Sequence, residues 1–239
     1  MQTQAVIGHI TGWLKDYALN ARAKGFVVGV SGGIDSAVVS ALAARTGLSV
    51  LLLDMPIRQK ADQSGRAQEH IRNLTRLFSN VSGQTVDLTP TFDTFAATVE
   101  AGGSEFPDKQ LALANARSRL RMVTLYYYGQ LHGCLVTGTG NKIEDFGVGF
   151  FTKYGDGGVD ISPIADLTKT QVYQLAAELG VAESIQKAVP TDGLWDTERT
   201  DEEQMGASYP ELEWAMSVYG TAKPEDFEGR RREVLEIYT

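Results

Sequence analysis

Short apolar runs alternate along the chain with longer segments in which apolar residues recur every three or four positions. The apolar runs cover residues 26–30, 49–55 and 133–138, and a shorter strand is expected at 84–88. Continuous apolar runs are typical of strands that are buried on both faces of a sheet. The segments with helical periodicity are 4–23, 34–44, 61–79, 109–132 and 168–179. This alternation predicts an α/β fold, a parallel sheet with helices on both faces.

The first apolar run leads directly into a Ser/Gly turn and then into a helix. Residues 26–37 read FVVGVSGGIDSA. The two adjacent glycines, Gly32 and Gly33, allow the backbone to come close to a ligand. The free N–H groups of the first helical turn and the helix dipole both face the turn. Since neighbouring serines add hydroxyl groups, the stretch predicts a phosphate cradle rather than a purely structural turn.

Asp35 is unexpected in a phosphate cradle, because a bare carboxylate repels phosphate. A Mg²⁺ ion between the carboxylate and the phosphate removes this conflict, since Mg²⁺ prefers hard oxygen ligands. Glu144 follows the strand at 133–138 and could supply a second carboxylate. Spacing alone favours the alternative that Glu144 is a solvated acid at a helix start, so both readings stay open.

Residues 151–160, FTKYGDGGVD, form a second unusual stretch. Glycines permit close approach of a ligand and aromatic rings can stack on one, while Lys153 and Asp160 can orient polar groups. An ordinary polar loop is the alternative, but it would leave Phe150 and Phe151 exposed for no purpose. We therefore interpret the stretch as a substrate-binding loop.

Composition and charge exclude several classes of protein. The chain has 239 residues, is 43% hydrophobic and carries a net charge of −8. It shows no basic stripe of the kind that nucleic-acid binding requires. No signal peptide or membrane span is expected. The lone Cys134 rules out a disulfide framework, so we expect a cytoplasmic protein that binds neither nucleic acid nor a membrane.

The motifs resemble those of a known enzyme group. SGGIDS is similar to the pyrophosphate-binding loop of the N-type ATP pyrophosphatases. The wider resemblance, to the bacterial ammonia-dependent NAD synthetases, rests on four segments in order: Gly29–Ser36, Asn115–Met122, Gly138–Lys169 and Pro190–Tyr209. Within the ATP pyrophosphatases, the sequence of residues 151–160 is nearly diagnostic of this family.

The resemblance implies a Rossmann-like fold of the adenine nucleotide alpha hydrolase type and a homodimer. It implies Mg²⁺ ligation by Asp35 and Glu144, and deamido-NAD binding by Arg119, Lys153 and Asp160. It also implies ATP binding by Gly29, Val30, Ser31, Gly32, Gly33, Ile34, Asp35, Ser36, Thr139, Lys169 and Thr191. Asp35 and Asp160 are the expected catalytic residues, the latter as a candidate proton acceptor.

The activity implied is ATP-dependent amidation of deamido-NAD (nicotinic acid adenine dinucleotide) through an acyl-adenylate, giving NAD, AMP and pyrophosphate. We expect residues 1–239 to form a single synthetase domain without a glutaminase domain, so that free ammonia is the nitrogen donor. Two alternatives remain. One is another adenylating amidotransferase with the same loop, such as a GMP synthetase-like domain, and the other is a nucleotide-binding module without turnover.

Overall fold

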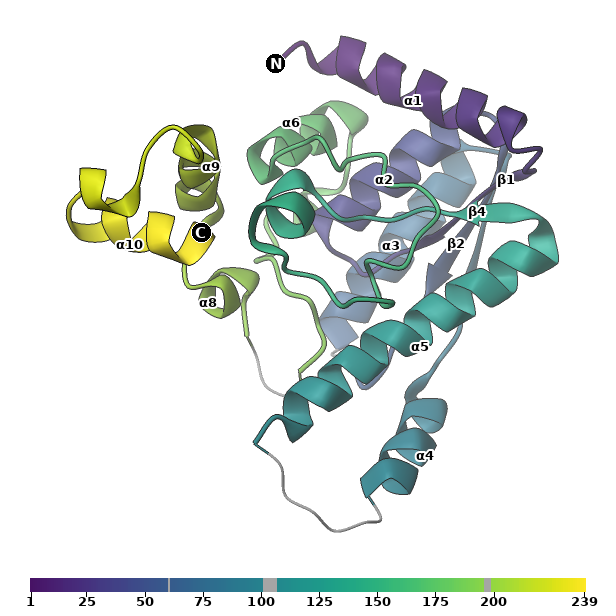
Figure 1. Cartoon of the computed structure of the whole chain (residues 1–239). Helices are drawn as coiled ribbons and strands as arrows, with labels where there is room; N and C mark the ends of the chain where they lie inside the picture. Colours follow the sequence, from purple (N-terminus) through teal and green to yellow (C-terminus); the bar gives the residue numbers. More distant parts are fainter. Residues whose placement is uncertain (60, 101–106, 196–198) are drawn as a thin grey trace.

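A computed structural model describes residues 1–59, 61–100, 107–195 and 199–239. Its centre is a parallel sheet of strands β1 (Gly25–Gly29), β2 (Ser49–Asp54), β3 (Val81–Thr85) and β4 (Cys134–Val136), in the order β3-β2-β1-β4. In the register, Val27 lies between Leu51 and Val136. The predicted parallel α/β sheet is confirmed, and Figure 1 shows the helices that surround it.

The third strand lies three residues earlier than the sequence predicts. Val81 pairs with Val50 and Thr85 pairs with Asp54, after which the chain leaves the sheet. This strand forms an edge of the sheet, and only Val81 in it is buried. An edge strand can be polar, whereas the prediction followed the apolar residues Val86 and Leu88, which lie just beyond the strand.

Helices cover both faces of the sheet, as predicted. The alternating side chains of β1 divide between them, because Phe26 and Val28 pack toward one face and Val27 toward the other. The first face carries α1 (Thr3–Asn20), α2 (Ile34–Arg45), α3 (Ala61–Leu77) and α6 (Lys169–Leu179). The second face carries α4 (Thr89–Glu100) and the long helix α5 (Lys109–His132), which crosses the front of Figure 1.

Several elements had no clear signal in the sequence. They are α4, the π-helix η1 (Lys142–Val148), α7 (Glu183–Gln186), α8 (Asp201–Met205), α9 (Tyr209–Val218), the 3₁₀ turn η2 (Pro224–Asp226) and α10 (Gly229–Tyr238). Residues 101–106 and 196–198 lie outside the described chain, and with them parts of the glycine-rich stretch after α4 and of the segment Pro190–Tyr209.

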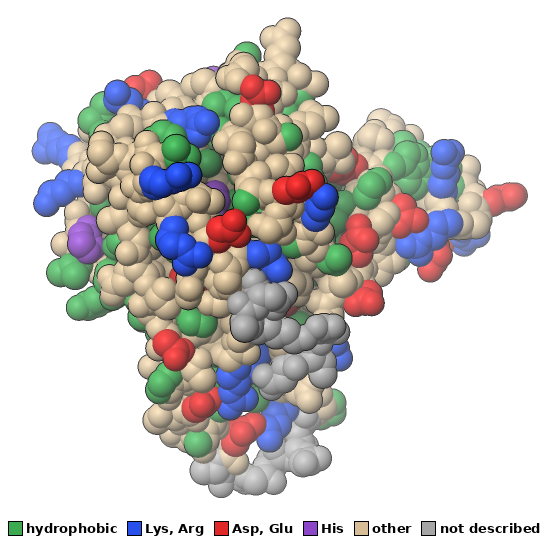
Figure 2. Space-filling view, turned by 180° about the vertical axis from the view of Figure 1, so that it is seen from behind, with side chains coloured by type: hydrophobic (Ala, Val, Ile, Leu, Met, Phe, Trp, Pro, Cys, Tyr) green, Lys and Arg blue, Asp and Glu red, His purple; other side chains and the backbone are tan. Residues whose placement is uncertain are grey.

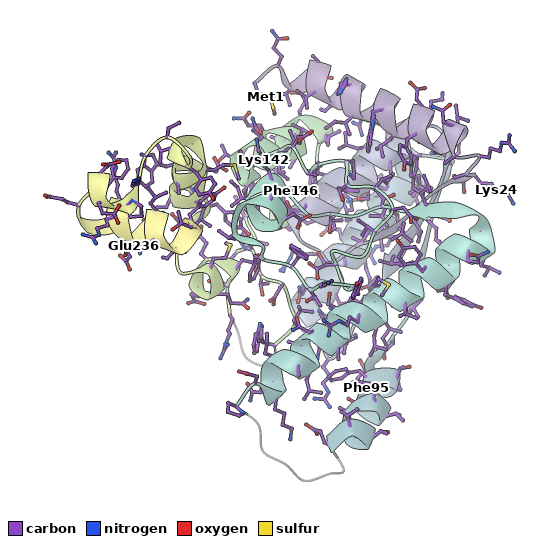
Figure 3. All side chains as sticks on the ribbon, viewed as in Figure 1. Met1, Lys24, Phe95, Lys142, Phe146 and Glu236 are labelled. Atoms are coloured by element: carbon purple, nitrogen blue, oxygen red, sulfur yellow. The ribbon has the colours of Figure 1, made fainter. Side chains whose placement is uncertain are left out.

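The last helices form a lobe with its own apolar core. Tyr209, Leu212 and Leu235 pack there against Ile143 of η1. The lobe stands to one side of the sheet in Figure 1, and Figure 2 shows it as a projection with both acidic and basic side chains on its surface. Figure 3 places η1, marked by Lys142 and Phe146, between this lobe and the main body. In the described chain, the longest helices are too polar to cross a bilayer.

The strand order fixes where a ligand can bind. From β1 the chain proceeds outward to β2 and β3 and then returns to β4 on the other side of β1. The loops after β1 and β4 therefore diverge, and a crevice opens between them at the carboxyl ends of the strands. Such switch points are the usual ligand sites of open α/β sheets.

A buried histidine makes the stability of this fold depend on pH. His70 of α3 contacts Ser40 of α2, with 2.8 Å between Nε2 and Oγ. Burial lowers the pKa of His70 to about 4, although a hydrogen bond to the Ala37 carbonyl opposes the shift. His70 of the unfolded chain therefore becomes protonated below about pH 6.5, whereas His70 of the folded chain stays neutral until the pH approaches 4. This contribution to stability is complete above about pH 6.5 and is lost as the pH falls toward 4.

We predict that His70→Gln flattens the fall in unfolding free energy between pH 6.5 and 4. The shift from 6.5 to about 4 corresponds to a difference of about 3 kcal/mol across that window. Urea titrations of wild type and variant at each pH give the unfolding free energy. The quantity compared between the two proteins is the slope of this free energy against pH. His9→Gln, at an exposed position on α1, serves as the control. Parallel curves for wild type and His70→Gln would contradict the assignment.

Candidate active site

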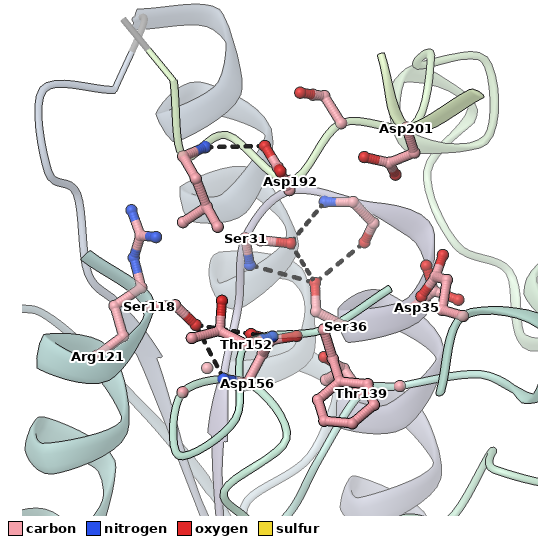
Figure 4. Close-up of a pocket in the computed structure, with 18 of the residues that line it drawn as sticks. Ser31, Asp35, Ser36, Ser118, Arg121, Thr139, Thr152, Asp156, Asp192 and Asp201 are labelled. Carbon is pink, nitrogen blue, oxygen red and sulfur yellow. Dashed lines mark hydrogen bonds between the residues drawn. The ribbon is translucent and has the colours of Figure 1, made fainter. Parts of the chain in front are cut away.

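The loop after β1 is held in a compact cradle by its two serines (Figure 4). The Ser31 N–H donates to Ser36 Oγ at 3.2 Å, and the Gly33 N–H donates to Ser31 Oγ at 3.2 Å. Ser36 Oγ donates in turn to the Gly33 carbonyl at 3.0 Å. α2 starts at Ile34, so its free N–H groups and the positive end of its dipole face the cradle. This geometry suits a phosphate group.

Glycine is required at one position of the cradle. Gly32 has φ +81°, in the left-handed region, and a Cβ there would lie 2.6 Å from the Gln63 carbonyl oxygen of α3. Any side chain at this position would push α3 away from the loop. The close approach of α3 also brings Arg66, whose Nε lies 3.4 Å from the Gly32 carbonyl oxygen.

A cavity of about 530 Å³ opens at the switch point between β1 and β4. It is lined by the cradle, by the loop after β4, by one side of α5 and by the start of α6. The lining includes every residue predicted to bind ATP or Mg²⁺, namely Gly29, Val30, Ser31, Gly32, Gly33, Ile34, Asp35, Ser36, Thr139, Glu144, Lys169 and Thr191. The structure thus brings the predicted nucleotide residues together, and their individual roles remain predictions.

The buried ammonium of Lys169 connects the two predicted metal ligands. Its Nζ lies 2.6 Å from Asp35 Oδ2 and 2.9 Å from Glu144 Oε1, and the lysine side chain is only 3% exposed. Burial alone would lower the pKa of Lys169, but the two carboxylates outweigh it and raise the pKa. The lysine is therefore charged at neutral pH. Segments of the chain more than 100 residues apart meet at this one group.

Asn141 fixes the relative position of the two carboxylates. It is fully buried, and its Nδ2 donates to Asp35 Oδ1 at 3.2 Å. Its Oδ1 accepts from the backbone N–H groups of Ile143 and Glu144, at 3.0 and 3.1 Å, and so caps η1. The sequence indicates this cap, because an Asn directly follows a Gly-rich turn. It does not indicate that Asn141 contacts Asp35.

The donor set fits a hard divalent cation that arrives with a nucleotide. Asp35 and Glu144 converge on one point, since a single ammonium contacts both. Within the described chain, no three His, Cys, Asp or Glu side chains converge well enough to hold a metal on their own. Mg²⁺ commonly takes one or two protein carboxylates together with substrate phosphates and water. The two carboxylates therefore match a site that a bound triphosphate completes.

The loop 151–160 is attached to α5 by partly buried hydrogen bonds. Ser118 Oγ donates to Asp156 Oδ1 at 2.7 Å and accepts from the Asp156 N–H at 2.9 Å. Thr152 Oγ1 donates to Asn115 Oδ1 at 2.8 Å. A Cβ on Gly155 would lie 2.3 Å from Ser118 Oγ, so only glycine allows this close approach. Gly155 thus allows the loop 151–160 to pack closely against α5, and these contacts fix the conformation of the predicted substrate loop.

The three residues predicted to bind deamido-NAD lie outside the cavity lining, and Arg119 and Lys153 are in direct contact. Arg119 Nε donates to the Lys153 carbonyl at 3.1 Å, and the Lys153 ammonium lies over the Tyr154 ring at 5.1 Å. Asp160 accepts from the Tyr126 hydroxyl at 3.0 Å and from the Val136 N–H at 2.8 Å. Arg119 and Lys153 thus form an exposed cluster outside the cavity, whereas Thr152, Gly155 and Asp156 of the same loop line it.

Seven charged residues in the cavity lining were not predicted, and Arg121 and Asp156 are two of them. Arg121 donates to the Met55 carbonyl at 3.1 Å and to Gln59 Oε1 at 2.9 Å. Burial, together with the charge of Arg117, lowers the pKa of Arg121 to about 10, which leaves it a cation at neutral pH. Asp156 is the other, and both are labelled in Figure 4. The helical period shows that Arg119 and Arg121 lie on different faces, but not which face meets the cavity.

Comparisons with known proteins agree on one family. The family model described as NAD synthase matches residues 6–235. The NH₃-dependent NAD⁺ synthetase of Archaeoglobus fulgidus is 37% identical over 239 residues, covering 99% of this chain and 92% of the relative. The enzyme of the same name from Finegoldia magna is 37% identical over 218 residues, covering 91% and 86%. The relatives thus include an archaeal protein, so the family extends beyond the predicted bacterial group.

Solved structures agree with the sequence comparison. The NMN synthetase of Francisella tularensis superimposes with a TM-score of 0.85 and 33% identity, covering 99% of this chain and 92% of that one. The NAD⁺ synthetase of Burkholderia pseudomallei has a TM-score of 0.76 and 27% identity, covering 100% and 88%.

We predict that Lys169→Met destabilises the protein, because it leaves two carboxylates facing each other without a cation. Removal of one partner from a buried ion pair typically costs about 3 kcal/mol or more. Urea unfolding at neutral pH measures the effect. Lys187→Met is the matched control, since Lys187 pairs with Glu183 on the surface and such pairs contribute less than about 1 kcal/mol. Equal loss in the two variants would show that the Lys169 cluster does not stabilise the fold.

Proposed function

The chain belongs to the NAD synthase family, and on that premise we propose that it is an ammonia-dependent ligase. It forms a carbon–nitrogen bond by converting the carboxyl group of deamido-NAD to the amide of NAD, with ATP as the second substrate. One observation carries the proposal: a phosphate cradle at the switch point directly adjoins the cluster of Asp35, Glu144 and Lys169. This arrangement suits chemistry on a triphosphate. The family match also makes a GMP synthetase-like activity the weaker alternative.

In the first step, the nicotinate carboxylate attacks the α-phosphorus of ATP. A carboxylate oxygen–phosphorus bond forms, the bond to the β-phosphate breaks, and pyrophosphate leaves with the electron pair. The N–H groups of the cradle and the Lys169 ammonium stabilise the phosphate charge, so the protein contributes mainly positioning and electrostatics. A Mg²⁺ held by Asp35 and Glu144 would neutralise charge on the departing pyrophosphate.

In the second step, ammonia attacks the carbonyl carbon of the acyl-adenylate. A carbon–nitrogen bond forms, the carbon–oxygen bond to AMP breaks, and the attacking nitrogen releases a proton. Asp160 is the acceptor that we predict from the sequence. Asp156 is a further candidate, because it lines the cavity and lies on the same loop. That loop joins the cavity to the exposed cluster of Arg119 and Lys153, where the rest of deamido-NAD would bind.

Free ammonia is the nitrogen donor that the comparisons favour. The relatives named NH₃-dependent are covered over 86% and 92% of their length. The glutamine-dependent NAD⁺ synthetase of Acinetobacter baumannii is covered over only 44% of its length. We accordingly propose that residues 1–239 act as one synthetase domain. We also propose a cytoplasmic location, which agrees with the single cysteine of the chain.

A second substrate is favoured by one specific observation. The NMN synthetase of Francisella tularensis resembles this chain with a higher TM-score and a higher identity than the NAD⁺ synthetase of Burkholderia pseudomallei. Nicotinic acid mononucleotide carries the same nicotinate carboxyl group as deamido-NAD, so the same two steps would convert it to NMN. We therefore propose it as an alternative acid substrate.

A homodimer is supported by the surface of α5. Val123, Tyr127 and Leu131 follow one another at intervals of one helical turn, and each side chain is largely exposed. Such a stripe is unusual on the surface of a monomer. Leu113 and Leu120, two other apolar residues of α5, pack inside the subunit instead.

Pyrophosphate release is the test of the proposed activity. We predict release with ATP, Mg²⁺ and deamido-NAD, and amide formation with ammonium but not with glutamine alone. Nicotinic acid mononucleotide replaces deamido-NAD in a parallel series, and the ratio of kcat/KM values identifies the acid substrate. Asp35→Asn should abolish release and leave the circular dichroism spectrum unchanged. No release with either acid would leave a nucleotide-binding module, and normal release by Asp35→Asn would exclude its role.

We predict that Lys153→Ala weakens binding of the acid substrate much more than binding of ATP. Lys153 lies outside the cavity, in the exposed cluster where the remainder of the acid substrate would bind. Loss of a charge-assisted hydrogen bond costs about 1.5–3 kcal/mol, roughly a ten- to hundred-fold loss in affinity. Separate calorimetric titrations with deamido-NAD and ATP measure the two effects, with Lys187→Ala as the control. Equal losses for both ligands would mean that Lys153 supports the loop rather than the substrate.

A further inference from the structure

The C-terminal lobe and the nucleotide site share the π-helix η1. Ile143 is fully buried in the apolar core of the lobe, where it packs with Leu212 and Leu235. The next residue, Glu144, lines the cavity and contacts Lys169. One helical segment therefore has one side chain in the lobe and the adjacent one in the site, so the position of the lobe bears on the orientation of Glu144.

Tyr209, the first residue of α9 in the lobe, reaches into this cluster. Its side chain is buried, and its hydroxyl lies 2.6 Å from Glu144 Oε1 and 3.2 Å from Asp201 Oδ2. The Lys169 ammonium lies over its ring, 4.6 Å from the centroid. Tyr209 thus contacts one of the two candidate metal ligands and also the cation between them.

The proton of the hydroxyl points toward Glu144. The hydroxyl is the donor in this contact, because Glu144 Oε1 is a carboxylate oxygen that accepts. A hydroxyl has one proton, and the shorter of its two contacts is to Glu144.

Both protein contacts to the Glu144 carboxylate use the same oxygen. Tyr209 and Lys169 bind Oε1, whereas Oε2 has no hydrogen-bond partner among the described residues. A glutamate side chain has several rotatable bonds, and fixing one oxygen orients the other. Metal-binding carboxylates are commonly fixed by such outer hydrogen bonds, and loss of one typically lowers metal affinity or activity about 10- to 100-fold.

We propose that Tyr209 is a positioning residue, whose hydroxyl orients Glu144 for the divalent cation that accompanies ATP and thereby connects the C-terminal lobe to the nucleotide site. The inference rests on the proposed function, because it assumes a metal–nucleotide complex at Asp35 and Glu144. It assigns a role in that complex to a residue that lies 65 positions from Glu144 in the chain.

The test is Mn²⁺ binding to Tyr209→Phe in the presence of α,β-methylene-ATP, followed by electron paramagnetic resonance of the free ion. The substitution removes one oxygen and keeps the ring over Lys169. We expect the Kd for Mn²⁺ to rise about tenfold or more. The Mg²⁺ concentration that gives half-maximal pyrophosphate release should rise in parallel, while kcat at saturating Mg²⁺ changes less. Unchanged Mn²⁺ affinity would overturn the proposal.

Three further variants separate positioning from general structural support. Tyr238→Phe, in the same lobe but in contact with Tyr219 rather than Glu144, should bind Mn²⁺ like the wild type. In a Glu144→Gln background, addition of Tyr209→Phe should cost no further affinity, and an undiminished effect there would overturn the proposal. Replacement of Tyr209 by 4-aminophenylalanine, which retains a donor, should restore affinity to within about threefold of the wild type, because the orienting hydrogen bond is kept.

The 4-aminophenylalanine variant also decides the question if Tyr209→Phe does not fold. A folded protein that contains this donor but binds Mn²⁺ as weakly as Glu144→Gln would contradict the role of the hydrogen bond. Failure of the proposed function gives a different result, because the wild type itself would then show no Mn²⁺ binding that depends on the nucleotide.

Discussion

The ion cluster around Lys169 is the interaction on which the site depends. Asp35 stands in the first turn of α2, directly after β1, whereas Glu144 in η1 and Lys169 at the start of α6 both follow β4. Two carboxylates this close would repel each other without a cation between them. The ammonium removes that repulsion in the free protein, and it does so at the position where a metal–nucleotide complex would require the same two carboxylates.

This arrangement also explains how an acidic protein can hold a polyphosphate. The net charge of −8 opposes anion binding at long range. The cavity lining is acidic as well, with seven Asp and Glu side chains against Arg66, Arg121 and Lys169, so a polyphosphate there would depend on the cradle N–H groups, on these cations and on a divalent ion that offsets the carboxylates. Buried charges act in a region of low dielectric and are weakly screened, so a few correctly placed groups outweigh the average charge of the surface.

The sequence predicted the parts whose signals are local. The cradle, the buried strands β1 and β2 and the helix α5 follow from glycine placement and periodicity over short windows. β3 was displaced because an edge strand need not be apolar. Asn141 and Tyr209 were missed for another reason: their roles exist only through partners about 100 and 65 positions away. Periodicity contains no information on such contacts. The family resemblance predicted site roles for Glu144 and Lys169, and both residues line the cavity. Spacing alone would have favoured a solvated surface position for Glu144.

The two faces of α5 suggest why the site divides into two regions. Ser118, Arg121 and Leu125 face the cavity, while Arg119 and Val123 face outward. The loop 151–160 follows the same division, with Asp156 inward and Lys153 outward. Tyr154 adopts φ +62°, a conformation that costs energy for a bulky residue and is retained where the surroundings impose it. An acid substrate that extends along this loop would place its carboxylate near the phosphates and its remainder on the exposed face of α5. Binding of that remainder would then be sensitive to the proposed dimer contact, because Val123, Tyr127 and Leu131 lie on the same helix.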